Sequence, residues 1–272
     1  MLEAFCYDEA MDEYLQFAQS LAKEAGEIML RYFFVTERTW KDDATPLTKA
    51  DTEINDLVIA RIRERYPDHS IHGEERSDYK DSAFMWVCDP VDGTLPYSSG
   101  ISASTFSLAL VIDGVSTVGV VYDPFNDRLF RAIKGEGSYV NDKKMHVSDQ
   151  ATLQNAVVDL EGVYHPYLDF EVPLSETFRE VLVDNGVRPV QLWSSILPSC
   201  LVAAGTFMAV IMDGKTVQDG AAIKVIVDEA GGKVTDMYGN EQRYDVPARG
   251  FIASNGLVHD ELVRLIRESA KT

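Results

Sequence analysis

The chain has 272 residues, 46% of them hydrophobic and 25% charged, which is typical of a globular protein with a sizeable core. Its 44 acids and 25 bases give a formal net charge of −19, which disfavours nucleic acid and anionic membranes as partners because binding their phosphates needs clustered Lys and Arg. No segment approaches the roughly 18 apolar residues of a membrane span, and the N-terminus is acidic where a signal peptide would be basic. We therefore expect a cytoplasmic protein whose partner is neither a nucleic-acid polymer nor a membrane.

The cysteines and histidines give no sign of a thiolate or histidine metal site. Cys6, Cys88 and Cys200 are widely spaced and form no CxxC motif, so neither a disulfide framework nor a zinc site is expected. The five histidines form no HExxH pair.

The first 70 residues predict two helices. Apolar residues recur at steps of four and three from Met11 to Tyr32, which indicates an amphipathic helix of about six turns. A polar loop follows at 41–51, and a second helix is expected from Asp51 to Arg65, before Pro67 stops the pattern.

The segment from 84 to about 150 predicts strands. Residues 84–89 are short, apolar and flanked by polar segments, which is typical of a buried strand that ends at Asp89. Residues 105–123 predict a hairpin with its turn at Asp113-Gly114, and 127–142 predict further short strands with glycine turns. The half formed by 1–150 is therefore expected to be α+β, with an antiparallel sheet.

After residue 150 the pattern changes to alternating strands and helices, which is typical of an α/β half over 151–272. The chain has no internal repeat, no low-complexity tract and no evident linker. We therefore expect the two halves to share an interface.

The motif DPVDGT at 89–94 places two aspartates three residues apart behind the buried strand. Pro90 biases the residue before it toward an extended conformation, and Gly93 permits an unusual φ. Thr94 is placed to begin a helix whose first N–H groups are unpaired. The two carboxylates, the carbonyl of Val91 and a helix N-terminus able to receive an anion suit a Mg²⁺ ion shared with a substrate phosphate.

Further acids could complete such a site, and each has a plainer explanation. Glu74 and Glu75 follow a short β-like segment, but they could be surface acids of a loop. Asp219 opens a predicted helix, where an N-cap is worth about 1 kcal/mol. Asp51 forms an approximate capping box with Thr48.

Three segments together resemble the signature of the inositol monophosphatase superfamily of metal-dependent phosphatases: GEE at 73–75, WVCDPVDGT at 86–94 and DGAAIKVIVDEAGG at 219–232. Residues 45–51 and 118–148 are similar to the upstream segment and the central sheet of that family. The resemblance covers roughly residues 10 to 267. It implies a layered αβαβα sandwich, combining α+β and α/β halves, and a homodimer.

The resemblance also implies which residues bind metal. Glu74, Asp89 and the carbonyl of Val91 would hold one Mg²⁺, and Asp89, Asp92 and Asp219 a second, with a third ion near Glu74 through water. The 1–150 half would thus supply most ligands, and the 151–272 half would supply Asp219 and part of the substrate pocket.

The implied chemistry is hydrolysis by direct in-line attack of water, without a phospho-enzyme. Thr94 and Asp51 match the pair that orients and deprotonates the attacking water, and Glu74 belongs with them as a catalytic residue. The amides of Gly93 and Thr94 would receive the phosphate.

The positions that contact the substrate depart from the family pattern. Gln218 stands where many members have Trp, and Trp193-Ser194-Ser195-Ile196 replaces the usual Gly-Ser/Thr-Ala. An acid that contacts a substrate hydroxyl in inositol phosphatases aligns with Met212, beside Asp213. The residues expected to contact phosphate or substrate are Gly93, Thr94, Ser194, Ser195 and Asp213.

We therefore predict a Mg²⁺-dependent phosphomonoesterase for a small phosphorylated metabolite, of the inositol or another polyol or sugar class. The alternative substrates are histidinol phosphate, fructose 1,6-bisphosphate and 3′-phosphoadenosine 5′-phosphate, and a bisphosphate would need a cation such as Lys215 or Lys224. The alternative class is a non-catalytic protein that binds phosphometabolites. The intact water-activating pair argues against that class.

Overall fold

The computed structural model describes residues 2–35, 37–42, 44–161 and 176–269. The helices are α1 (Leu2–Tyr32), α2 (Lys49–Arg65), α3 (Thr94–Ser98), α4 (Glu176–Asp184), α5 (Ile196–Ala203), α6 (Gln218–Glu229) and α7 (His259–Ser269). The earlier strands are β1 (Thr39–Trp40), β2 (Pro46–Leu47), β3 (Ser70–Gly73), β4 (Phe84–Asp92), β5 (Thr105–Ile112), β6 (Val115–Asp123), β7 (Arg128–Ile133), β8 (Gly137–Val140) and β9 (Lys143–Lys144). The later strands are β10 (Val157–Glu161), β11 (Arg188–Val190), β12 (Ala209–Met212), β13 (Lys233–Thr235) and β14 (Phe251–Ser254).

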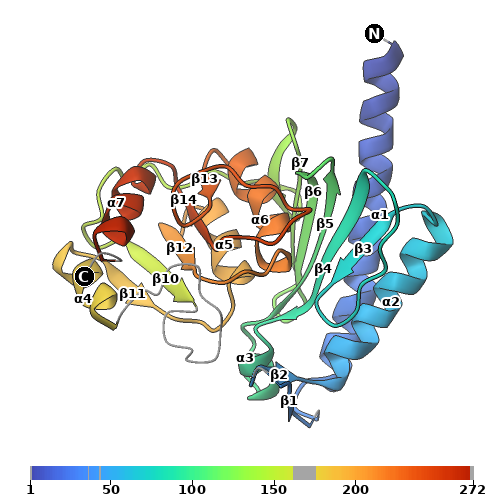
Figure 1. Ribbon diagram of the computed structural model, residues 1–272, viewed down its shortest axis with the longest axis horizontal. Coiled ribbons are helices and arrows are strands. Elements are labelled where there is room, and N and C mark those ends of the chain that lie inside the picture. The colour runs from blue at the N-terminus through green and yellow to red at the C-terminus, as the bar shows by residue number, and fades with distance from the viewer. Residues whose placement is uncertain (1, 36, 43, 162–175, 270–272) are drawn as a thin grey trace.

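The elements stack in five layers of helix, sheet, helix, sheet and helix (Figure 1). Helices α1 and α2 cover one face of a seven-stranded sheet, and α5 and α6 lie between that sheet and a five-stranded one. Helices α4 and α7 cover the far face of the second sheet. Clusters of buried hydrophobic side chains fill the space between the layers. The predicted αβαβα sandwich is confirmed.

Both N-terminal helices begin earlier than their patterns predict. The apolar pattern starts at Met11, whereas α1 starts at Leu2, and its first turns project beyond the sheet (Figure 1). Because these turns do not pack on the sheet, they need no apolar stripe, and the high intrinsic helix propensity of Leu, Glu and Ala favours the helix there. Helix α2 starts at Lys49 rather than Asp51, because the capping box of Thr48 fixes its first turn.

The seven-stranded sheet has the order β3-β4-β5-β6-β7-β8-β9 and is antiparallel except for the parallel pair β3–β4. The predicted hairpin is confirmed, since β5 and β6 meet at Asp113-Gly114 with φ of 52° and 82°. Positive φ at both positions is what a type I′ turn requires, because its twist matches that of the flanking strands.

Strand β4 continues beyond its predicted end. The sequence predicts an end at Asp89, but the strand runs to Asp92. Its pairing with β5 jumps from Asp89–Ser107 to Asp92–Thr105. Pro90 has no N–H to donate to the ladder, so the strand bulges there and resumes pairing. The prediction was wrong because the proline interrupts the pairing without ending the strand.

The five-stranded sheet has the order β11-β10-β12-β14-β13. Strand β10 is parallel to β11 and β12, whereas β14 is antiparallel to both β12 and β13. The predicted alternation of strands and helices is confirmed up to β13. Strand β14 then follows a loop rather than a crossover helix, which reverses its direction.

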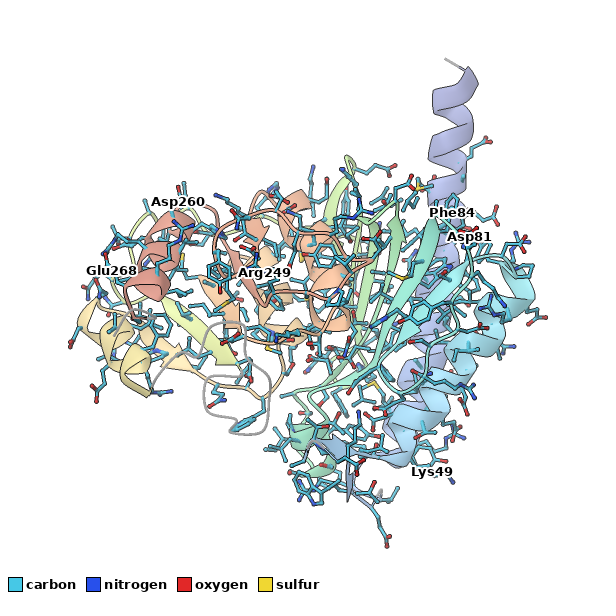
Figure 2. All side chains as sticks on the ribbon, viewed as in Figure 1. Lys49, Asp81, Phe84, Arg249, Asp260 and Glu268 are labelled. Atoms are coloured by element: carbon cyan, nitrogen blue, oxygen red, sulfur yellow. The ribbon has the colours of Figure 1, made fainter. Side chains whose placement is uncertain are left out.

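Charged side chains such as Lys49, Asp260 and Glu268 lie on the outer helices (Figure 2). Among the described helices, none combines the length and the apolar character that crossing a membrane requires. Cys88 and Cys200 are buried free thiols, and the side chain of Cys6 lies outside the described part of the chain.

Helix α6 joins the two halves, since it packs on β5 and β6 of the first sheet and on β13 of the second. The closest approach is at Gly119 of β6. A Cβ there would lie 2.7 Å from the carbonyl oxygen of Ala222 and 2.7 Å from Cγ1 of Val225. Only glycine lets the helix backbone come this near to the strand.

We expect Gly119→Ala to lower the free energy of unfolding by about 1–3 kcal/mol, because the added methyl group overpacks the contact with α6. Chemical denaturation followed by circular dichroism measures the change. Val115→Ala, at the exposed end of the same strand, is the control and should change stability by less than about 0.5 kcal/mol. Equal stability of Gly119→Ala and the wild type would show that α6 does not depend on this contact.

Candidate active site

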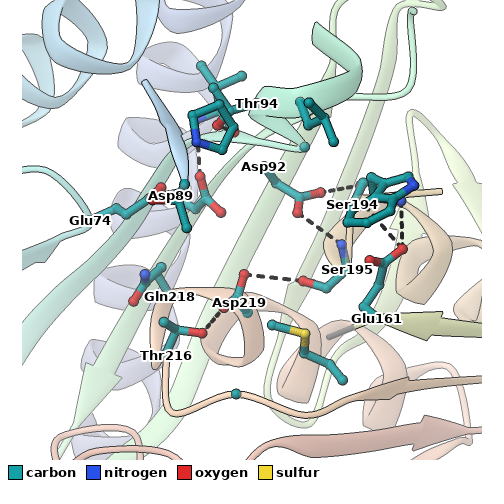
Figure 3. A pocket seen from close by; sticks show the side chains of 18 of the residues that line it. Glu74, Asp89, Asp92, Thr94, Glu161, Ser194, Ser195, Thr216, Gln218 and Asp219 are labelled. Carbon is teal, nitrogen blue, oxygen red and sulfur yellow. Dashed lines mark hydrogen bonds between the residues drawn. The ribbon is translucent and has the colours of Figure 1, made fainter. Parts of the chain in front are cut away.

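A cavity of about 490 Å³ lies where β4 ends, and its walls come from both halves of the chain (Figure 3). The first half contributes residues of the β1–β2 region, β4 and α3. The second half contributes residues of β10, of the segment 191–195 and of the start of α6. The site therefore depends on the packing of the two halves.

Three carboxylates gather in this cavity. Asp89 and Asp92 stand on either side of the bulge in β4, and Asp219 comes from the first turn of α6. One oxygen of each lies within 4.8 Å of the others. Residues that are far apart in the sequence are thus brought together by the contact between α6 and the first sheet.

Burial and mutual repulsion raise the pKa values of these carboxylates, so they hold their protons more tightly than free aspartates do. Burial raises the pKa of Asp89 well above its usual range, and the nearby Glu74 and Asp92 add to the rise. Burial also raises the pKa of Asp92 to about 6 and that of Asp219 to about 7. In the described part of the chain, no lysine or arginine forms an ion pair with any of the three. Two buried carboxylates and a partly buried one, none of them paired with a lysine or arginine of the described residues, fit a hard divalent metal ion.

The segment before α5 holds these carboxylates in place. Ser195 N donates to Asp92 Oδ1 at 3.0 Å, and Ile196 N donates to Asp92 Oδ2 at 3.2 Å. The Ser194 hydroxyl also donates to Asp92, and the Ser195 hydroxyl donates to Asp219 Oδ1 at 3.2 Å. Both serines line the cavity as predicted, but their hydroxyls here orient the carboxylates. Their contact with a substrate stays a prediction.

The structure brings Asp51 and Thr94 together across 43 residues of sequence. Thr94 Oγ1 lies 3.1 Å from Asp51 Oδ1 and 3.0 Å from the carbonyl oxygen of Val91. Its hydroxyl has one proton, so it donates to one of these two oxygens at a time. Asp51 Oδ2 accepts from Thr48 N at 2.8 Å. The capping box and the pairing with Thr94 therefore use different oxygens of one carboxylate. Burial raises the pKa of Asp51 to about 7.

Glu74 also lines the cavity, with a cation already beside it. Lys41 Nζ lies 2.8 Å from Glu74 Oε1 and 2.5 Å from Glu75 Oε1. The sequence pattern shows only a polar loop around Lys41 and gives no reason to place it here. Glu74 lines the same cavity as the three aspartates, but it does not belong to the group whose oxygens lie within 4.8 Å of one another.

Gly93 forms the turn between β4 and α3, with φ of 77°. A Cβ there would lie 3.0 Å from Cβ of Ser194 and 3.1 Å from the carbonyl oxygen of Ala103. The predicted helix start at Thr94 is confirmed, but α3 has only 5 residues. Any contact with a phosphate at this turn must therefore rest on individual amides rather than on a helix dipole.

Two of the other predicted positions lie apart from the cavity. Asp213 is fully buried and is not among the cavity-lining residues, whereas Met212 before it is. Lys215 lines the cavity, and Lys224 instead forms ion pairs elsewhere on α6.

The sequence patterns missed several lining residues. Glu161, at the end of β10, lines the cavity on the other side of Ser194 from Asp92, with Met212 as its Cα partner on β12. Trp40 was also missed, and it lines the cavity while remaining 59% exposed. Trp193, which the sequence does single out, lines the cavity while remaining 44% exposed. The alternating acids of VVDLE, within a strand that is otherwise buried, are a signal that could have indicated Glu161.

Residues 10–271 match the inositol monophosphatase family. Inositol monophosphatase 1 of Solanum lycopersicum is 32% identical over 96% of this chain and 97% of its own length. Fructose-1,6-bisphosphatase/inositol-1-monophosphatase of Thermotoga maritima is 31% identical over 93% of this chain and 96% of its own.

The fold agrees with that match. The solved structure of a Thermotoga maritima IMPase covers 95% of this chain and 98% of its own, with a TM-score of 0.84 and 28% identity. The resemblance inferred from the three sequence segments is thus confirmed over nearly the whole chain. The chain belongs to the inositol monophosphatase family of phosphoric monoester hydrolases.

Proposed function

We propose that the chain is a Mg²⁺-dependent phosphatase that hydrolyses the phosphomonoester of a small polyol or sugar. One observation carries the proposal, namely three carboxylates, two buried and one partly buried, that converge on one cavity and form no ion pair with a lysine or arginine among the described residues. The glycine turn at Gly93 lies in the wall of the same cavity, where a phosphate can approach the backbone closely.

The donors suit Mg²⁺, which prefers carboxylate and carbonyl oxygens and shares its remaining positions with water and phosphate. We place two ions here, one on Glu74, Asp89 and the Val91 carbonyl and one on Asp89, Asp92 and Asp219, with a weaker third near Glu74. When bound, such ions neutralise phosphate charge and make water a better nucleophile. A metal near Glu74 would also compete with the ammonium group of Lys41.

The chain's own groups supply the proton transfer. A water beside Thr94 attacks phosphorus, and its proton passes toward Asp51, which burial gives a pKa near 7. The bond from phosphorus to the leaving oxygen breaks, and the alkoxide takes a proton to leave as an alcohol. No side chain becomes phosphorylated in this reaction. The amides of Gly93 and Thr94 would orient the phosphate.

The alternative substrates differ in what they require of the cavity. Lys215 lines the cavity and supports a second phosphate, as fructose 1,6-bisphosphate or 3′-phosphoadenosine 5′-phosphate would carry. Trp40 and Trp193 offer exposed aromatic faces, which suit a sugar or the imidazole of histidinol phosphate. A direct contact between Ser194, Ser195 or Asp213 and the substrate, the homodimer and the cytoplasmic location stay predictions.

We expect phosphate release from inositol 1-phosphate or sugar phosphates to require Mg²⁺, and Asp92→Asn to lower its rate at least about 100-fold, because the variant loses the charge of a metal ligand. A colorimetric phosphate assay, with and without EDTA, measures both effects. Asp260→Asn, an exposed acid on α7, is the matched control and should keep wild-type activity. Near wild-type activity of Asp92→Asn would contradict the metal assignment, and no turnover over a broad phosphate panel would favour the non-catalytic alternative.

We expect Thr94→Ala to lower kcat by about 100-fold, because it removes the hydroxyl that links the attacking water to Asp51. The change leaves the capping box of α2 intact. Thr94→Ser keeps the hydroxyl and should restore most of the activity. Stabilisation by Mg²⁺ should be similar in all three proteins, and an unchanged kcat of Thr94→Ala would exclude the proposed role.

Metal binding should strengthen as pH rises, because Mg²⁺ must displace protons from carboxylates whose pKa values are raised. In the metal-free protein these groups hold protons more tightly folded than unfolded, so they reduce stability as pH rises from about 4 to about 7. Mg²⁺ reverses that loss. We expect the rise in Tm on adding Mg²⁺ to be several-fold larger at about pH 8 than at about pH 5.5. Differential scanning fluorimetry measures it, and an equal rise at both pH values would contradict this linkage.

A further inference from the structure

Five acids line the cavity among the described residues, and four of them belong to the proposed metal site: Glu74, Asp89, Asp92 and Asp219. The fifth, Glu161, stands at the end of β10 in the other half of the chain (Figure 3). Its side chain is only 6% exposed, and yet it borders the cavity. The carboxylate cluster lies at β4 and α6, so we assign the part of the cavity that Glu161 borders to the leaving group.

The protein supplies donors to one oxygen of this carboxyl group. Trp193 N donates to Glu161 Oε1 at 2.6 Å, and Ser194 N approaches the same oxygen at 3.4 Å. These two amides fix the orientation of the side chain. Asp159 shares a side-chain hydrogen bond with the same carboxyl group. Each carboxyl oxygen has two lone pairs, so acceptor capacity remains on the second oxygen for a group that enters the cavity.

The neighbour of Glu161 in the strand pair is apolar, since Met212 is its Cα partner on β12 and lines the same cavity. An acid with such surroundings distinguishes ligands that carry a hydrogen-bond donor from ligands that do not. A ligand without a donor would leave a desolvated acceptor oxygen unsatisfied. Hydroxyl and ammonium groups are the donors that small phosphorylated metabolites carry.

We propose that Glu161 is a specificity-determining residue, which accepts a hydrogen bond from a hydroxyl or ammonium group on the leaving group of the substrate. The inference rests on the proposed phosphatase function and deepens it. It selects for phosphate esters of polyols, sugars and amino alcohols, and against esters whose leaving group has no donor.

Glu161→Gln is the sharpest test, since the amide oxygen still accepts from Trp193 N while the second acceptor oxygen is lost. The probes are inositol 1-phosphate and glycerol 2-phosphate for hydroxyl donors, phosphoethanolamine for an ammonium donor, and p-nitrophenyl phosphate for neither. We expect kcat/KM to fall about 10- to 100-fold for the donor-bearing probes that the wild type hydrolyses. For p-nitrophenyl phosphate it should change less than about twofold. A larger loss with one donor type identifies that donor as the group that Glu161 accepts.

Glu180→Gln, an exposed glutamate on α4 that does not line the cavity, is the matched control and should keep wild-type kcat/KM for every probe. Asp159 is unsuitable as a control, because its side chain is hydrogen-bonded to Glu161. If Glu161 only positioned the segment 191–195, Glu161→Gln would lower kcat/KM equally for every probe, which would overturn the inference. Thermal melting of both variants checks that they fold.

The outcomes separate the two proposals. A wild type that hydrolyses the probes, together with a uniform loss or no loss in Glu161→Gln, would refute the role of Glu161 and leave the phosphatase function standing. A wild type that releases no phosphate from any probe with Mg²⁺ would refute the function, and the inference with it.

Discussion

The repulsion among three clustered carboxylates, two of them buried, is the constraint on which the rest of the site depends. Asp89, Asp92 and Asp219 lie with oxygens within 4.8 Å of one another, and burial shifts all three toward their protonated forms. A folded chain accepts such a cluster only if other groups hold it together. Hydroxyls and amides from the start of α5 supply part of that stabilisation, and a divalent cation is the remaining partner that the charges call for.

The layered architecture makes this arrangement possible. Helix α6 is packed between two sheets, so the position of Asp219 is set by contacts on both sides, including the close approach at Gly119. The bulge at Pro90 sets the relation between the two aspartates of β4. Because each carboxylate is placed by a rigid element, the site is largely formed before any metal arrives.

Local chemistry explains which features around the carboxylate cluster can be predicted from the sequence. The motif at 89–94 contains its own turn, and the paired Thr48 and Asp51 form a capping box that any fold would keep. The remaining features depend on long-range packing. Lys41 lies in a predicted polar loop, and only the folded structure places it beside Glu74. Met212 and Asp213 are adjacent in the sequence, and the sequence alone does not show which of the two side chains faces the cavity. The sequence predicts too short a β4, because a proline usually ends a strand, whereas Pro90 only introduces a bulge.

One residue joins the carboxylate cluster to the proposed specificity residue. Ser194 directs its hydroxyl to Asp92 and its amide toward Glu161, so both depend on a single backbone position. Trp193 beside it has φ of 57°, a left-handed conformation that is costly for a large residue and persists only where its surroundings hold it. The short hydrogen bond from its amide to Glu161 is one such restraint. Glu161→Gln keeps the acceptor for the Trp193 amide, so it should leave this segment and the carboxylates in place, whereas loss of that acceptor would disturb both. We therefore expect substitutions that change substrate specificity to be tolerated only where they preserve the backbone conformation of residues 193–194.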